Sequence, residues 1–166
     1  MDYTTDYVID LNEYEYEFCP LCKYQKDCHS FHKVLETEEY IYYYTCPSEA
    51  IHYDDTDGII SHLYNELEDC IKKEKKWIWL FNSYDFGLKH AAQISQSKRF
   101  IEFLYPRYTY LLENIIIIDK TNCFKILYNT IYYLIPKTLR ETIIFNDSKK
   151  FNISIIRDQN VLYISI

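Results

Sequence analysis

One short segment concentrates cysteine and histidine at spacings that suit a metal ion. Cys19 and Cys22 form a Cys-x2-Cys pair, and Cys28 and His32 follow, four residues apart. Zinc takes four nitrogen or sulphur ligands at tetrahedral angles, and two such pairs can supply all four. If residues 28 and 32 lie on a helix, their side chains share one face. We therefore predict a structural zinc site formed by Cys19, Cys22, Cys28 and His32.

Other states of these cysteines remain open. The two pairs are separated by a shorter spacer than in ordinary zinc fingers, so the loop between them must be tight. A disulfide in an oxidising particle and unrelated reduced thiols are the alternatives. A catalytic metal is disfavoured, because protein would fill all four positions. The opening MDYTTDYVID has no basic stretch followed by an apolar one, so we expect no standard export signal.

The remaining reactive residue types have simpler interpretations. Cys70 and Cys123 lie on the apolar sides of expected helices, where small buried hydrophobes are usual. The acidic run 54–57 beside His52 could bind a cation, but a turn that begins a helix uses the same residues, and we favour the turn. Two glycines cannot build a phosphate-binding loop, and no Gly-x-Ser-x-Gly motif occurs. We expect no enzymatic activity.

Composition sets the class of protein. The 166 residues are 48% hydrophobic and 18% aromatic, enough for one domain with a real core. We expect a single domain over residues 1–166, with an N-terminal arm and Cys/His segment at 1–36 and an α/β core at 37–166. A net charge of −7 works against binding through phosphates, so we expect no nucleic acid partner.

Two features of the sequence indicate where in the cell the protein is expected. The longest aliphatic run, Ile115 to Ile118, is far too short to span a membrane, which predicts a cytoplasmic protein with at most transient membrane contact. The excess of tyrosine and isoleucine is typical of an A/T-rich genome. Large DNA viruses and some parasites fit that profile. For a viral protein, the host cytoplasm or the virion is the expected location.

Hydrophobic periodicity predicts alternating strands and helices. Apolar residues at three- and four-residue spacing indicate helices, and short β-branched or aromatic runs indicate strands. The expected strands are 39–46, 76–82, 115–119 and 142–146, followed by a hairpin of 152–157 and 161–166, and the expected helices are 59–71, 91–104 and 122–135. This order predicts an α/β fold with a mostly parallel sheet and helices packed on it.

The ordered set of these segments resembles a known family. The stretches KKWIWLFNSYDFGLKHA and FLYPRYTYLLENIIIIDKTNCFKILYNTIYYLIPKTLRETIIFN resemble the CRAL-TRIO lipid-binding domain, and EYIYYYTCPSEA resembles its early strand. The similarity covers roughly residues 39–146. In that family the sheet is the floor of an apolar pocket and a mobile helix closes it.

The resemblance implies a site. A lipid or fatty acyl chain would lie between the sheet and the helix of residues 122–135, held without catalysis or an organic cofactor. The implied ligand-binding residues are Trp79, Phe81, Ile116 and Ile118 from the strands, with Phe124, Leu127, Ile131 and Leu134 from the helix. The same apolar pattern also fits an ordinary filled core.

Departures from the family keep a second function open. Arg107 and Glu141 stand where phosphoinositide-binding members carry the opposite charges, so we expect no phosphoinositide preference and a pair between these two side chains. The divergent branch found in Rho GTPase-activating proteins and BCH scaffold proteins resembles the chain equally well. The alternative is therefore a protein-interaction module with a protein partner and a filled core.

Overall fold

A five-stranded sheet lies at the centre of the computed structural model, which describes residues 5–10, 19–146, 154–158 and 161–165. The strand order is β2-β3-β4-β5-β6, with β2 antiparallel to β3 and the other pairs parallel. The strands are β2 (His32–Glu36), β3 (Tyr40–Thr45), β4 (Lys76–Asn82), β5 (Leu112–Ile118) and β6 (Ile143–Phe145). The prediction of an α/β fold with a mostly parallel sheet is confirmed.

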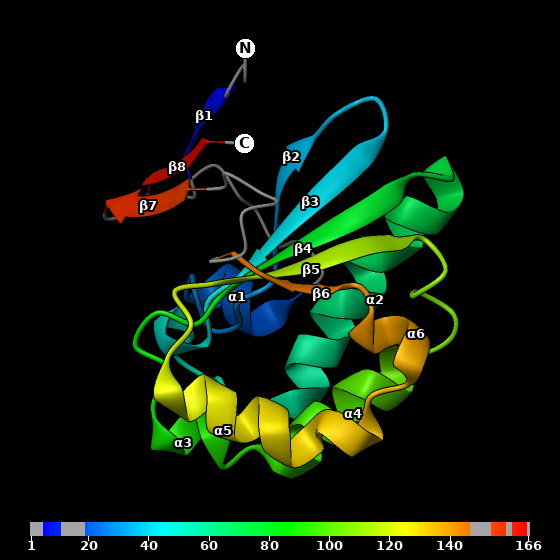
Figure 1. Cartoon of the computed structure of the whole chain (residues 1–166). Helices are drawn as coiled ribbons and strands as arrows, with labels where there is room; N and C mark the ends of the chain where they lie inside the picture. Colours follow the sequence, from blue (N-terminus) through cyan, green and yellow to red (C-terminus); the bar gives the residue numbers. More distant parts are fainter. Residues whose placement is uncertain (1–4, 11–18, 147–153, 159–160, 166) are drawn as a thin grey trace.

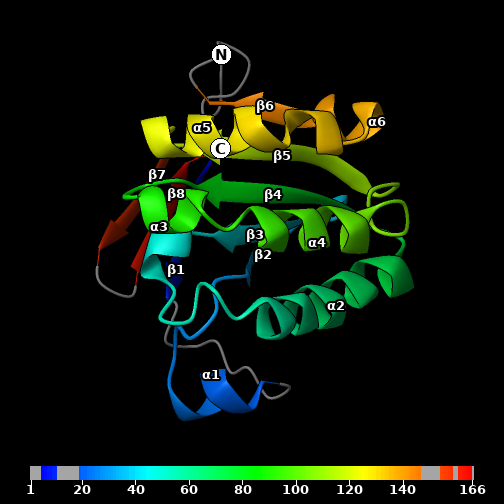
Figure 2. The ribbon, with the colours of Figure 1, turned by 90° about the horizontal axis from the view of Figure 1, so that it is seen from below.

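The larger helices cover one face of this sheet (Figures 1 and 2). The helices are α1 (Pro20–Tyr24), α2 (Thr56–Lys73), α3 (Leu88–Ala91), α4 (Ile94–Leu104), α5 (Asn122–Ile131) and α6 (Lys137–Arg140), with short 3-10 turns η2 (Pro47–Glu49) and η3 (Tyr132–Leu134). The helix expected over 91–104 is α4, which begins three residues later than expected, and the short helix α3 precedes it. Among the described residues, no helix is long and apolar enough to cross a membrane.

A small antiparallel sheet lies on the other side of the large one (Figure 1). Its order is β1-β8-β7, formed by β1 (Asp6–Asp10), β8 (Val161–Ser165) and β7 (Ser154–Asp158). The predicted C-terminal hairpin is therefore present, and part of the N-terminal arm pairs with it. Ile164 is buried against the large sheet, together with partly buried Tyr7 and Ile9. The rest of the arm, residues 1–4 and 11–18, lies outside the described residues.

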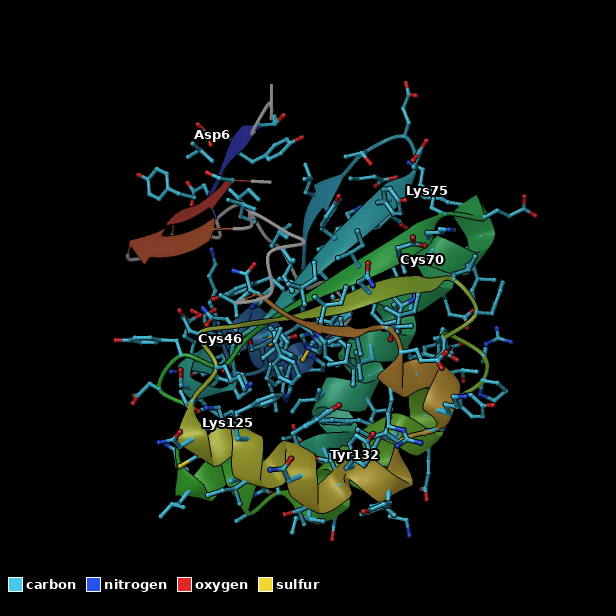
Figure 3. The ribbon with its side chains drawn as sticks, in the orientation of Figure 1. Asp6, Cys46, Cys70, Lys75, Lys125 and Tyr132 are labelled. Carbon is cyan, nitrogen blue, oxygen red and sulfur yellow. The ribbon has the colours of Figure 1, made fainter. Side chains whose placement is uncertain are left out.

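Strict alternation along the central strands makes two separate cores. On β4, Trp77 and Trp79 face the helices, whereas Ile78 and Leu80 face the small sheet. Because both faces are covered, the strand needs apolar residues at successive positions, which explains the run KWIWLFN. Figure 3 shows the side chains that fill the space between the sheet and the helices.

Local capping fixes the two helices that matter most for the sites. Asp55 caps α2 by accepting the backbone N–H of Gly58 at 3.2 Å, and Glu74 ends that helix in the left-handed region with a φ of 52°. Thr121 caps α5 by accepting the N–H of Phe124 at 3.2 Å. The acidic run before α2 thus provides the predicted helix-starting turn.

Candidate functional site

Four buried donor groups from three segments meet beside the start of α2. Cys19 precedes α1, Cys22 lies within it, His29 lies just before β2, and His62 lies on α2. The two sulphurs and two ring nitrogens all lie within 4.8 Å of one another, so this group could hold a metal ion. Cys22 Sγ is 3.5 Å from His62 Nε2, and His29 Nδ1 is 3.1 Å from the same nitrogen.

Neighbouring polar groups orient these donors. Nε2 of His29 lies 2.7 Å from Oδ2 of Asp55, so Nδ1 is the nitrogen that faces the cluster. The backbone N–H of Cys22 points at Cys19 Sγ at 3.5 Å. Burial opposes ionisation of Asp55, but hydrogen bonds from His29 and the Gly58 amide hold the pKa of this carboxyl below its ordinary value.

Burial keeps two of the donors, Cys22 and His62, neutral when no metal is bound. Burial, with a smaller contribution from the neighbouring Cys19, raises the pKa of the Cys22 thiol to about 12. Burial also lowers the pKa of His62 to about 4, with a further contribution from His29. At neutral pH and without a metal, Cys22 is therefore a thiol and His62 is an uncharged imidazole, because desolvation penalises the charged form of each.

The structure changes half of the predicted ligand set. Cys19 and Cys22 belong to the group, but Cys28 and His32 do not, and His29 and His62 take their places. The prediction assumed a helix through residues 28–32, whereas α1 ends at Tyr24. The Cys28 thiol donates to the Gln25 carbonyl at 3.1 Å, and His32 begins strand β2.

Sequence spacing could have indicated only one of the missed donors. His29 lies inside the segment already rich in cysteine, so its proximity was a usable signal. His62 is 40 residues from its nearest sulphur partner, Cys22, and sits on a helix whose apolar pattern explains it equally well as a core residue.

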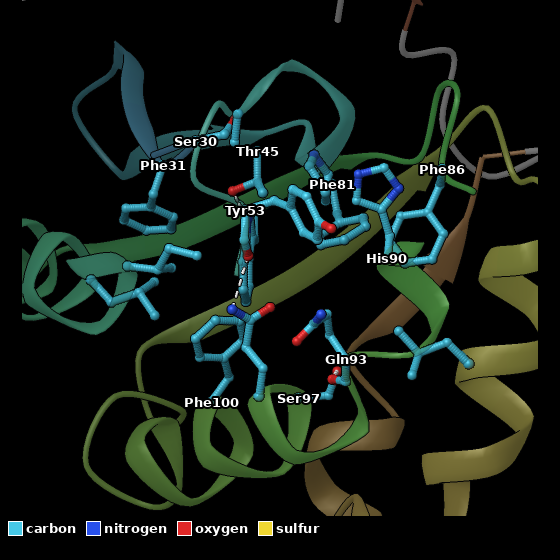
Figure 4. Close-up of a pocket in the computed structure, with 17 residues that line it drawn as sticks. Ser30, Phe31, Thr45, Tyr53, Phe81, Phe86, His90, Gln93, Ser97 and Phe100 are labelled. Carbon is cyan, nitrogen blue, oxygen red and sulfur yellow. Dashed lines mark hydrogen bonds between the residues drawn. The ribbon is translucent and has the colours of Figure 1, made fainter. Parts of the chain in front are cut away.

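A second feature is an apolar cavity of about 90 Å³ between β4, α2 and the start of α4 (Figure 4). Its walls include Phe31, Leu63, Trp79, Phe81 and Phe100, with Leu127 from α5. Its polar lining groups mostly bond to one another or to backbone. Trp79 Nε1 donates to Thr45 Oγ1 at 2.8 Å, and Gln96 Nε2 donates to the Tyr53 carbonyl at 2.9 Å.

A neighbouring cavity of about 130 Å³ extends under α5. It shares Trp79, Phe81, Ser97, Phe100 and Leu127 with the first and is closed by Phe124, Ile131, Ile135, Ile115 and Ile117. The two cavities therefore form adjoining parts of one apolar region between the sheet and the helices.

Comparison with known families identifies the family to which this chain belongs. Residues 38–160 match the CRAL/TRIO domain, which is well over half of the chain. The chain belongs to the CRAL/TRIO family. CRAL/TRIO domains generally bind lipophilic ligands and are typically non-catalytic. A search of curated protein sequences finds no significant match. Of the four metal-binding candidates, only His62 lies within the matched part, and the other three precede it.

Five of the eight predicted ligand-binding residues line the two cavities: Trp79, Phe81, Phe124, Leu127 and Ile131. The placement of Ile116 and Ile118 on the cavity floor is wrong, because both face the small sheet. In the parallel register Trp79 lies beside Ile115 and Phe81 beside Ile117, so these isoleucines share the cavity face.

Two expectations about polar and helical positions are also corrected. Leu134 is 47% exposed in η3, and buried Ile135 lines the cavity instead, because α5 ends at Ile131 and the helical period stops there. Arg107 pairs with Glu68 at 2.8 Å and Glu141 with Lys137 at 3.9 Å, so the expected pair between Arg107 and Glu141 does not form.

One donor on the wall of the first cavity has no hydrogen-bond partner among the described residues. The backbone N–H of Gly87 donates to His90 Nδ1 at 3.0 Å, which assigns the ring proton to Nε2. Burial, assisted by Lys89, lowers the pKa of His90, so the ring is neutral. Its Nε2 is buried and unpaired, and the ring lies beside Tyr53 and Phe86 (Figure 4).

Proposed function

We propose that this chain, acting as a single domain, binds one lipid or fatty acyl chain between the sheet and α5 without catalysing a reaction. The observation that carries the proposal is the pair of adjoining apolar cavities, which share Trp79, Phe81 and Leu127. Burial of apolar surface, at about 25 cal/mol per Å², supplies the affinity. The family's general preference for lipophilic ligands supports the same reading.

Cavity size requires the walls to separate on binding. The cavities measure about 90 and 130 Å³, whereas small-molecule sites usually occupy roughly 300–1,000 Å³. Helix α5 is an outer wall of the cavities, since Phe124 and Leu127 are buried while Ile126 on its other side is 55% exposed. We propose that α5 moves outward to admit the acyl chain.

The side chain of His90 indicates how the ligand is oriented in the cavities. Its unpaired Nε2–H requires an acceptor, because a buried donor without a partner is costly. A carboxylate, carbonyl or hydroxyl oxygen meets that need, whereas a pure hydrocarbon does not. We therefore propose that the acyl chain lies under α5 with its oxygen-bearing end at His90, and that a fatty acid is the simplest ligand.

Leu127→Trp tests the proposal because Leu127 lines both cavities. We expect the wild type to bind a fluorescent fatty acid at tens of micromolar or tighter, about −6 kcal/mol. The indole would occupy ligand space, so binding should weaken at least about tenfold with little change in melting temperature. Ile126→Trp, on the exposed side of the same helix, should leave both measurements unchanged.

A filled core predicts a different pattern. The larger side chain would then displace packed neighbours and cost about 1–3 kcal/mol. That result, together with no fatty acid binding by the wild type and no co-purified lipid in native mass spectra, would overturn the lipid function. It would favour the protein-interaction module instead.

A further inference from the structure

Four of the six distances among the donor atoms match a specific coordination shell, and all six are within 4.8 Å. The sulphur–nitrogen distances are 3.5 Å from Cys19 and 3.6 Å from Cys22 to His29 Nδ1, and 3.5 Å from Cys22 to His62 Nε2, and the two nitrogens are 3.1 Å apart. Zinc bonds of about 2.3 Å to sulphur and about 2.0–2.1 Å to nitrogen, at tetrahedral angles, place such atoms about 3.6 and 3.3 Å apart. We infer that Cys19, Cys22, His29 and His62 hold one zinc ion.

The chemistry of the donors selects zinc and a structural role. Two thiolates and two imidazoles suit zinc, whereas calcium and magnesium prefer oxygen ligands. All four residues are at most 5% exposed, and together they fill a tetrahedral shell. A closed shell leaves no position for a water or a substrate, which is the pattern of structural sites.

Groups around the donors are arranged as a metal site requires. Asp55 holds the proton of His29 on Nε2 through the 2.7 Å contact, which leaves the Nδ1 lone pair directed at the ion. The Cys22 backbone N–H donates to Cys19 Sγ at 3.5 Å, which holds this sulphur beside the other donors. The carboxylate–histidine arrangement is independent of the cysteine spacing, and it supports the same assignment.

The ion would connect the N-terminal segment to the cavity wall. Ser30 and Phe31 follow His29, Leu63 follows His62, and all three line the first cavity. Zinc therefore fixes the part of that wall formed by the segment just before β2 and by α2. This role goes beyond ligand binding, and the site stands whether or not the cavity accepts a lipid.

Metal analysis of the full-length protein, purified under reducing conditions, tests the assignment. We expect about one zinc per chain, a lower melting temperature after treatment with a strong chelator, and recovery when zinc is returned. Replacement of zinc by cobalt(II) should give a thiolate charge-transfer absorption. Less than about a tenth of an equivalent of zinc overturns the proposal, because structural sites bind tightly. A mass two hydrogens lower, from a Cys19–Cys22 disulfide, also overturns it.

Single-residue variants distinguish this ligand set from the one that contains Cys28 and His32. Cys22→Ser and His62→Asn should lose zinc, whereas the neighbouring Cys28→Ser and His32→Asn should retain it. The reverse pattern would overturn the assignment in favour of Cys28 and His32. If a variant fails to fold, the cobalt spectrum of the wild type still decides, because a site with two thiolates absorbs more weakly than one with three. A wild type that is purified without zinc and still binds fatty acid would contradict this proposal and leave the proposed function standing.

Discussion

The carboxylate of Asp55 bonds at once to the imidazole of His29 and to the first turn of α2. Oδ2 lies 2.7 Å from His29 Nε2, while Oδ1 accepts the N–H of Gly58 at 3.2 Å. One side chain therefore begins the helix that carries His62 and orients His29 beside it. The metal donors and the wall of the apolar cavity are consequently parts of one local structure.

The first prediction concerns Gly58, because a Cβ there would collide with Asp55 Oδ2 and with the His29 ring. In an ordinary helix Gly→Ala stabilises by up to about 1 kcal/mol. Here we expect Gly58→Ala to destabilise by about 1–3 kcal/mol and to reduce zinc content, since the His29–Asp55 contact must break.

Urea unfolding and metal analysis measure the effect of Gly58→Ala. Ser61→Ala is the matched control, because Ser61 is exposed on the same helix, and we expect a change within about 0.5 kcal/mol. A stabilised Gly58→Ala protein with full zinc would show that the close approach has no role in the site.

The second prediction removes the unpaired donor of His90. His90→Phe keeps the ring but deletes Nε2–H, so we expect weaker fatty acid binding. A hydrogen bond to a charged acceptor contributes about 1.5–3 kcal/mol, or roughly 10- to 150-fold in Kd. Stability should change little, because the loss of the unsatisfied Nε2–H offsets the loss of the hydrogen bond that Nδ1 accepts from the Gly87 N–H.

A hydrocarbon dye without an acceptor provides the control ligand for His90→Phe. Its affinity should be equal for the two proteins, because it gains nothing from the Nε2–H. Equal loss of both ligands would show that the substitution distorts the cavity and that His90 does not direct the polar end.

The fold could be predicted from sequence because it depends on local patterns. Asp55 and Thr121 are recognisable caps, and the run Lys76–Asn82 is strand β4 over its full predicted length. The face of each residue in β5 could not be predicted, since four successive isoleucines carry no alternation. Their orientation is set by register against β4, where Ile115 lies beside Trp79.

The metal donors also show which parts of a site can be predicted from sequence and which depend on contacts between distant segments. Cys19 and Cys22 are identifiable because the Cys-x2-Cys spacing is local. His62 reaches the site only because α2 packs against the segment before β2, a contact that no spacing encodes. Cys28 has the right residue type, but the end of α1 turns its thiol toward backbone carbonyls.

The third prediction uses Ile115 and Ile116 as a matched pair on opposite faces of β5. Ile116 is 1% exposed in the core against the small sheet, so Ile116→Ala should cost about 2–5 kcal/mol without altering the Kd for fatty acid. Ile115→Ala removes a cavity contact and should change that Kd, at a stability cost near the low end of the range. Equal Kd values for both variants would contradict the cavity assignment.

The fourth prediction concerns pH and the Glu36 cluster. Its carboxylate lies 2.9 Å from the Lys75 ammonium and 3.1 Å from those of Lys33 and Lys73. These hydrogen bonds, that of Lys75 first, lower the pKa of Glu36 to about 2. A lowered folded-state pKa means that the stabilisation is complete above the unfolded value of about 4.3 and is lost as pH falls toward 2.

Unfolding of wild type and Glu36→Gln by urea between pH 7 and pH 2 measures this contribution. The carboxylate is 27% exposed, so we expect the wild type to be more stable at pH 7 by at most about 1 kcal/mol. The difference should shrink as pH falls from about 4 to 2, and acid effects common to both proteins cancel in it. Glu113→Gln is the control, because Glu113 contacts only one lysine among the pairs described, Lys76 at 2.7 Å, and is more exposed. A difference that grows in acid would show that the lysine cluster does not stabilise the charged form of Glu36.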